Sequence, residues 1–102
     1  MWLWYDWRSA VVADDNGNIL DSEEWDGWRD TDSLCTRIEL IAAGAITPEA
    51  ERLSERFPDA VIRIHGDEEL PDADWPLPTS DALAALDNAA ILLSKRGVDA
   101  AA

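Results

Sequence analysis

The sequence has few of the residues that support metal sites, disulfides or nucleophilic catalysis. It contains one cysteine, Cys35, and one histidine, His65, among its 102 residues. A single cysteine cannot form an internal disulfide, so the sequence favours a reducing compartment. One cysteine and one histidine also fall short of the usual ligand set of a structural zinc site. The sequence therefore predicts no metal site and no cofactor.

Long apolar runs and phosphate-binding loops are also missing. No Walker-type loop and no G-x-G-x-x-G motif occurs in the chain. No apolar stretch approaches the roughly 18 residues needed to span a bilayer. A leader with a basic start and an apolar core is not evident either. The expectation is a cytoplasmic domain that does not enter a membrane.

Positive charge is scarce. Lys95 is the only lysine among eight basic residues, which face 22 acidic ones, and the formal net charge is −14. A field of this sign repels phosphate backbones and anionic lipids, so direct nucleic-acid and membrane contact by this domain is disfavoured. Acidic, lysine-poor surfaces suit a cytoplasm with molar salt, where screening suppresses self-repulsion. An acidic domain from a high-GC organism remains the alternative interpretation.

The first 25 residues predict an antiparallel β-ribbon. Asn16-Gly17 between apolar runs is a strong hairpin signal and predicts a type I′ turn. A further turn is expected at residues 6–9, although no glycine is present there. The alternative is one long bent strand over residues 2–13. The preferred strands are residues 2–5, 10–14 and 19–25.

The remainder of the chain predicts three helices and one further strand. Asp32 or Ser33 is the expected N-cap of the first helix, and Gly44 its end. Thr47 and Pro48 begin the second helix. A β-branched strand then joins the ribbon as an inner strand of one mixed sheet, so that 102 residues form a single small α/β domain with a capping C-terminal helix. Thr79 or Ser80 is expected to cap the last helix, and Gly97 lies just past its end. The expected ranges are helices 33–44 and 48–57, strand 60–65, loop 66–78 and helix 80–96.

The last helix carries more apolar residues than one packed face requires. Leu83, Leu86, Ala90 and Leu93 share one side at 100° per residue. Leu92 falls nearly opposite this stripe and is expected to be exposed, with Ile91 to one side. Tryptophan is enriched at protein interfaces, and several of the six tryptophans fall at turns or in loops. The candidate partner-binding residues are Trp25, Trp28, Leu70, Trp75, Leu77, Ile91 and Leu92.

The search for catalytic residues is mostly negative. The acidic hairpin turn lacks the spacing of a calcium loop, because placing Gly17 sixth puts Val12 first. His65 has no serine or cysteine placed for activation. One enzymatic alternative stays open: a ribonuclease-H-like nuclease holds magnesium with carboxylates from separate elements, here Asp6 and Glu39. The preferred interpretation assigns Asp6 to a turn and predicts no catalytic residue.

The order of these motifs resembles a known family. The resemblance depends on Ala10-Val11-Val12-Ala13-Asp14-Asp15-Asn16-Gly17-Asn18-Ile19-Leu20-Asp21, a helix from Leu34, a second helix from Pro48, and Phe57-Pro58-Asp59-Ala60-Val61-Ile62. This pattern resembles the N-terminal domain of the archaeal Nop proteins, in particular the haloarchaeal members. Those proteins are the scaffold of the box C/D small ribonucleoprotein.

The resemblance implies a protein-docking role without catalysis. In that family the N-terminal domain is α/β and recruits fibrillarin, the methyltransferase that modifies ribose 2′-hydroxyls under RNA guidance. A following coiled coil dimerises the scaffold, and a C-terminal domain contacts the guide RNA. Neither later part is present in this sequence. The expected function is thus recruitment of fibrillarin for RNA-guided RNA methylation, with the oligomeric state left open. The alternatives are a ribonuclease-H-like metal-dependent nuclease or a degenerate remnant of one, and an acidic halophilic domain of unassigned role.

Overall fold

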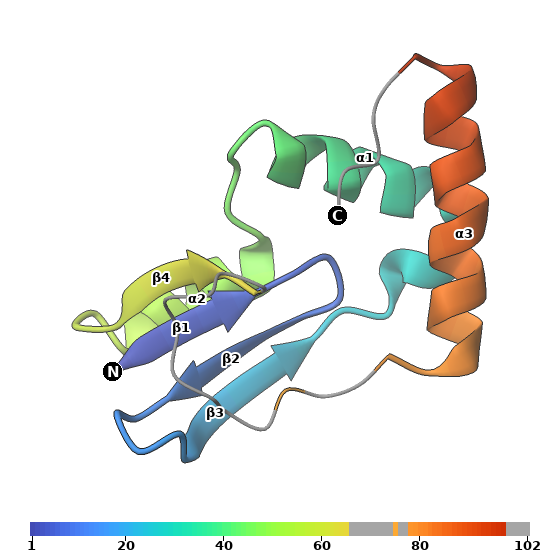
Figure 1. The fold of residues 1–102 in the computed structure, drawn as a ribbon. Helices are drawn as coiled ribbons and strands as arrows, with labels where there is room; N and C mark the ends of the chain where they lie inside the picture. Colours follow the sequence, from blue (N-terminus) through green and yellow to red (C-terminus); the bar gives the residue numbers. More distant parts are fainter. Residues whose placement is uncertain (66–74, 76–77, 98–102) are drawn as a thin grey trace. The chain divides into compact units, whose positions relative to one another are not determined.

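Four strands form one mixed sheet in the computed structural model, which describes residues 1–65, 75 and 78–97 (Figure 1). The strand order is β3-β2-β1-β4, with the first three antiparallel and β4 parallel to β1. This confirms the predicted mixed α/β fold. The sequence reading placed the fourth strand inside the sheet, whereas β4 lies at an edge of the described sheet. The strands are β1 (Trp2–Tyr5), β2 (Ser9–Ala13), β3 (Ile19–Glu24) and β4 (Val61–Ile64).

Asp6 makes the turn between β1 and β2. One carboxylate oxygen, Oδ1, accepts hydrogen bonds from the backbone N–H of Arg8 at 2.7 Å and of Ser9 at 2.9 Å. The backbone N–H of Asp6 donates to the carbonyl of Ser9 at 3.0 Å. An aspartate side chain can thus close a turn that lacks glycine. The result is two separate strands, and the alternative of one bent strand is wrong.

The hairpin between β2 and β3 is present, but its turn is not type I′. Gly17 has a φ of 84°, and among the described residues no non-glycine residue has a positive φ. A type I′ turn needs a positive φ at both of its central residues. Oδ1 of Asp14 accepts from the N–H of Asn16 and of Asn18, each at 2.9 Å. These bonds, first of all the one from Asn18, lower the pKa of the Asp14 carboxyl. The aspartate selects a longer turn with glycine as its left-handed residue.

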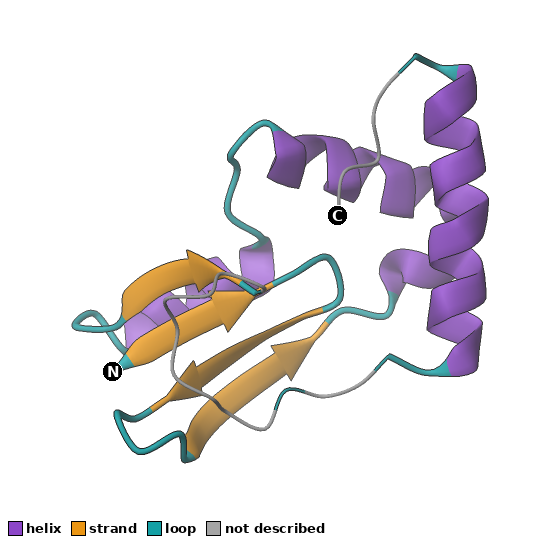
Figure 2. Ribbon diagram, in the orientation of Figure 1, coloured by secondary structure: helices purple, strands orange, loops and turns teal. Residues whose placement is uncertain are grey.

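Helix α2 (Pro48–Arg56) packs against β1, β2 and β3. The side-chain oxygen of Thr47 accepts from the N–H of Ala50, so the predicted cap is confirmed. Ala50 and Leu53 are fully buried on the inner side of the helix. Pro58 follows soon after the helix end, as expected, because proline disfavours a helical conformation in the residue before it. Burial of this short stripe attaches the helix to one face of the sheet (Figure 2).

Arginines of α2 extend this attachment to the edge strand β3. Nε of Arg52 lies 2.9 Å from a carboxylate oxygen of Glu23, and Nη2 of Arg56 lies 2.8 Å from the other oxygen. Arg56 also lies 3.2 Å from Asp21. Asp21 and Glu23 share a face of the sheet because side chains alternate along a strand. The face covered by α2 is therefore the one that carries Asp21 and Glu23.

A second group of elements consists of helices. The 3-10 helix η1 (Gly27–Arg29), α1 (Thr31–Ala42) and α3 (Ser80–Lys95) contact one another. Asp30 caps α1: its carboxylate accepts from the N–H of Ser33 at 3.2 Å and from its hydroxyl at 2.6 Å. The helix thus begins earlier than predicted, because Asp30 rather than Asp32 or Ser33 binds the free N–H groups of the first turn.

The helix ends were easier to predict than the buried face of α3. Gly44, at φ 90°, follows α1, and Thr79 caps α3 by accepting from the N–H of Ala82. The predicted stripe on α3 is displaced, however. Ala82, Ala89 and Leu93 are fully buried, whereas Leu83 is 48% exposed. Alanine lets α1 approach closely: Sγ of Cys35 lies 3.8 Å from the carbonyl oxygen of Ala89.

The chain divides into two compact units. The sheet unit comprises Met1–Trp25 and Thr47–Pro76, and the helical unit comprises Asp26–Ile46 and Leu77–Ala102. Each contains its own buried side chains, such as Leu3 and Leu53 in the first and Leu34 and Leu93 in the second. That the two behave as a single domain stays a prediction. None of the described helices is long and apolar enough to span a membrane.

Candidate interaction surfaces

The loop-edge tryptophans are less available to a partner than the sequence suggested. Trp28 is buried in the helical unit, and the guanidinium carbon of Arg29 lies 4.6 Å from the centroid of its ring. Trp25, in the sheet unit, is half-buried, and its backbone N–H donates to the carbonyl of Arg8 at 2.8 Å. Burial of the Trp28 ring removes it from the candidate contact residues, which corrects its assignment as partner-binding.

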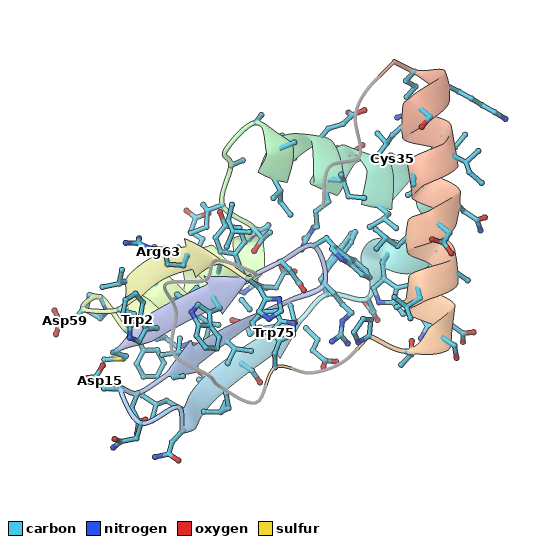
Figure 3. All side chains as sticks on the ribbon, in the orientation of Figure 1. Trp2, Asp15, Cys35, Asp59, Arg63 and Trp75 are labelled. Atoms are coloured by element: carbon cyan, nitrogen blue, oxygen red, sulfur yellow. The ribbon has the colours of Figure 1, made fainter. Side chains whose placement is uncertain are left out.

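Trp75 belongs to an aromatic cluster of the sheet unit. Its ring stacks on the imidazole of His65, with centroids 4.1 Å apart and an interplanar angle of 10°. Trp4 lies at a tilt to both rings, with each pair of centroids 6.4 Å apart. Figure 3 labels the Trp75 side chain beside the strands. The half-buried Trp75 thus has ring partners within the chain. Leu70 and Leu77 lie outside the described residues.

His65 is perturbed by its place in this cluster. Burial lowers the pKa of its imidazole, and the nearby negative charge of Asp6 opposes this by raising it. No serine or cysteine contacts the ring among the interactions of His65 that the structure describes. The stacking with Trp75 gives the histidine a packing role at the end of β4.

Helix α3 presents large apolar side chains away from its packed face. Ile91 is 56% exposed, as its assignment to a contact surface requires. Leu83 is also exposed, although the sequence reading placed it in the core stripe. Leu92 is half-buried, so the expectation that it would be exposed is wrong. The buried face is centred on Ala89 and Leu93 rather than on Leu86 and Ala90, and this rotation brings Leu92 to its border.

A second apolar surface was not predicted. Three of the four residues of β4 are apolar and exposed: Val61 by 41%, Ile62 by 37% and Ile64 by 44%. The sequence predicted an inner strand here, because a β-branched run that follows a helix after an antiparallel ribbon suggests a strand that joins the sheet. An edge strand can carry the same β-branched run as an inner strand, so this sequence feature does not separate the two. Only the pairing order distinguishes the two positions.

The carboxylates of the nuclease alternative are not brought together in one unit. Asp6 belongs to the sheet unit and Glu39 to the helical unit. Oδ1 of Asp6 is engaged by two backbone N–H groups of its own turn. Within residues 1–65, 75 and 78–97, no group of three or more histidine, cysteine or acidic side chains is arranged to hold a metal ion. The described geometry thus supplies no observation in favour of the nuclease alternative.

The comparisons with known proteins found no relative. No protein-family model matches the chain, and no curated protein and no solved structure matches it either. The likeness to the Nop N-terminal domain therefore depends on the order and chemistry of the sequence motifs.

Proposed function

We propose that this chain is a non-catalytic protein-docking module of the box C/D ribonucleoprotein scaffold type, and that it recruits fibrillarin. The observation that carries the proposal is the outer side of α3, where Leu83 and Ile91 are exposed in an acidic chain. An exposed apolar patch rimmed by polar residues is typical of a contact surface. The element order agrees with the α/β domain that the family resemblance implies.

The proposed contact surface lies along one side of α3. Leu83, Asp87 and Ile91 are spaced by four residues, so they lie on one side of the helix. All three are exposed, whereas Ala89 and Leu93 face the core of the helical unit. A partner that covers this side would bury two large aliphatic groups and meet one carboxylate. A basic rim on fibrillarin would complement this carboxylate and the net charge of −14.

The binding test compares two variants, each of which replaces an exposed aliphatic residue by aspartate. Ile91→Asp places a charge in the proposed contact and should weaken binding of purified fibrillarin at molar KCl at least about tenfold. Leu20→Asp is the matched control, because Leu20 is a similarly exposed aliphatic residue in the sheet unit. It should bind like the unmodified chain. Isothermal titration calorimetry would measure both. Absence of binding by the unmodified chain, or equal loss in both variants, would contradict the proposal.

The non-catalytic part of the proposal has its own test. Magnesium titration followed by tryptophan fluorescence, together with a nuclease assay, should give no response in the unmodified chain. A response that Asp6→Asn abolishes would instead establish the nuclease alternative.

A further inference from the structure

We infer that the outer edge of β4 pairs antiparallel with β4 of a second copy of this chain. The inference concerns the sheet unit and does not depend on the docking of fibrillarin. The strand is exposed along its whole length, from Val61 to Ile64. An exposed, apolar edge strand is a ready template for pairing with another strand. Figure 3 shows the Arg63 side chain on this edge strand.

The hydrogen bonds to β1 define which backbone groups of β4 face outward. The N–H of Val61 donates to Met1 at 3.0 Å, and the N–H of His65 donates to Tyr5 at 2.8 Å. Inward and outward groups alternate along a strand, so the N–H groups of Ile62 and Ile64 point away from β1. The guanidinium of Arg63 donates to the carbonyl of Ile62 at 2.9 Å, which fits an outward carbonyl. The outer edge thus presents the N–H groups of Ile62 and Ile64 to a second strand.

The two edges of the described sheet differ in charge. The strand at the far edge, β3, includes Asp21, Glu23 and Glu24, and acidic edge residues keep strands of identical chains apart. In β4 the only charged residue is Arg63. In a chain with a net charge of −14, this is the edge where a second copy meets the least repulsion from the strand itself.

The sequence around β4 is complementary to itself in an antiparallel pair. With Ile62 opposite Ile62 of the second copy, Ala60 faces Ile64 and Val61 faces Arg63. Asp59 precedes the strand, so this register brings Arg63 of each copy within two residues of Asp59 of the other. Figure 3 shows both charged side chains in the sheet unit. Each copy thus contributes the same patch, as a two-fold interface requires.

The size of the contact and the net charge predict a weak, salt-dependent dimer. A pair of four-residue strands buries less than the roughly 1,200 Å² of a standard interface. Two copies also repel each other, but at about 1 M salt the screening length falls to roughly 3 Å. Dimers should therefore form at high protein concentration in molar KCl and dissociate at low salt.

Sedimentation velocity of the full chain in about 2 M KCl, over a range of protein concentrations, tests the inference. The unmodified chain should show a monomer–dimer equilibrium. Ile62→Pro removes the outward N–H but none of the bonds to β1, so it should raise the dimer dissociation constant at least about tenfold. Leu40→Lys, at an exposed aliphatic residue of α1, is the control and should leave the equilibrium unchanged.

A second variant guards against a folding defect in Ile62→Pro. Ile62→Lys replaces the apolar contact at the symmetric position with two ammonium groups that pairing would have to desolvate, so it should also dissociate the dimer while the thermal midpoint is retained. A chain that is monomeric at every concentration in molar KCl would overturn the inference. A dimer that persists in both Ile62 variants would overturn it equally.

Discussion

The imidazole of His65 lies parallel to the indole of Trp75, at a centroid distance of 4.1 Å. Burial lowers the pKa of this imidazole below its ordinary value of 6.5, although Asp6 partly offsets the shift. The folded chain therefore binds a proton at His65 less readily than the unfolded chain does. Stability from this group is complete above pH 6.5 and is lost as the pH falls through the folded-state pKa.

The expected outcome is a decrease in thermal midpoint as the pH is lowered from 7 into the range below 6.5. His65→Phe retains a ring for stacking but does not titrate, so its midpoint should fall less over the same range. The fluorescence of Trp75 should change over the pH range in which His65 is protonated, because a protonated imidazole then lies against its ring. A Trp75→Phe variant should lose this signal. Identical pH profiles for His65→Phe and the unmodified chain would contradict the assignment.

Asp6 is predicted to be required for the turn between β1 and β2. Asp6→Ala removes the acceptor of the two N–H bonds at 2.7 and 2.9 Å. Loss of such bonds to a carboxylate should lower the free energy of unfolding by about 1–3 kcal/mol. Asp6→Asn keeps an acceptor oxygen and should lose less. Urea unfolding followed by tryptophan fluorescence measures both variants. Equal stability of Asp6→Ala and the unmodified chain would show that the turn does not depend on this side chain.

Gly44 offers a test of backbone strain without side-chain clashes. Its φ is 90°, and a Cβ built at this position would meet no atom within 4 Å. The only cost of Gly44→Ala should therefore be the strain of an L-residue in the left-handed conformation. It should lower the free energy of unfolding by about 1–2 kcal/mol. Gly44→Asn should cost less, since asparagine tolerates this conformation better. Urea unfolding of the two variants provides the comparison, and an equal cost would point to a cause other than φ.

The acidic composition predicts a strong dependence of stability on salt. The net charge of −14 opposes compaction at low ionic strength, and KCl screens this repulsion. The thermal midpoint should therefore rise between about 0.1 M and about 2 M KCl. The exposed ion pairs of Arg52 and Arg56 with Glu23 weaken over the same range but contribute little. An unchanged midpoint would count against the halophilic interpretation of the sequence.

Local chemistry was enough to predict the order and most ends of the elements. Thr47 and Thr79 cap α2 and α3 because their side chains accept from N–H groups in the next turn. Gly44 and Gly97 follow α1 and α3 in left-handed conformations that glycine adopts readily. These effects involve residues within a few positions of each other, so a pattern in the sequence contains all the partners. The type of the turn after Asp14 was predicted incorrectly, because hydrogen bonds to the Asp14 side chain select a longer turn than type I′.

The packing partners were decided only by the tertiary structure. The sequence by itself determined that α3 is amphipathic, but packing against α1 and η1 buries Ala82 and Ala89 in place of Leu83. Likewise, the β-branched run Val61–Ile64 determined a strand, while its pairing with β1 alone made it an edge. Both outcomes depend on residues far apart in the chain. Periodicity specifies the faces of an element, whereas the surface that each face meets depends on the rest of the fold.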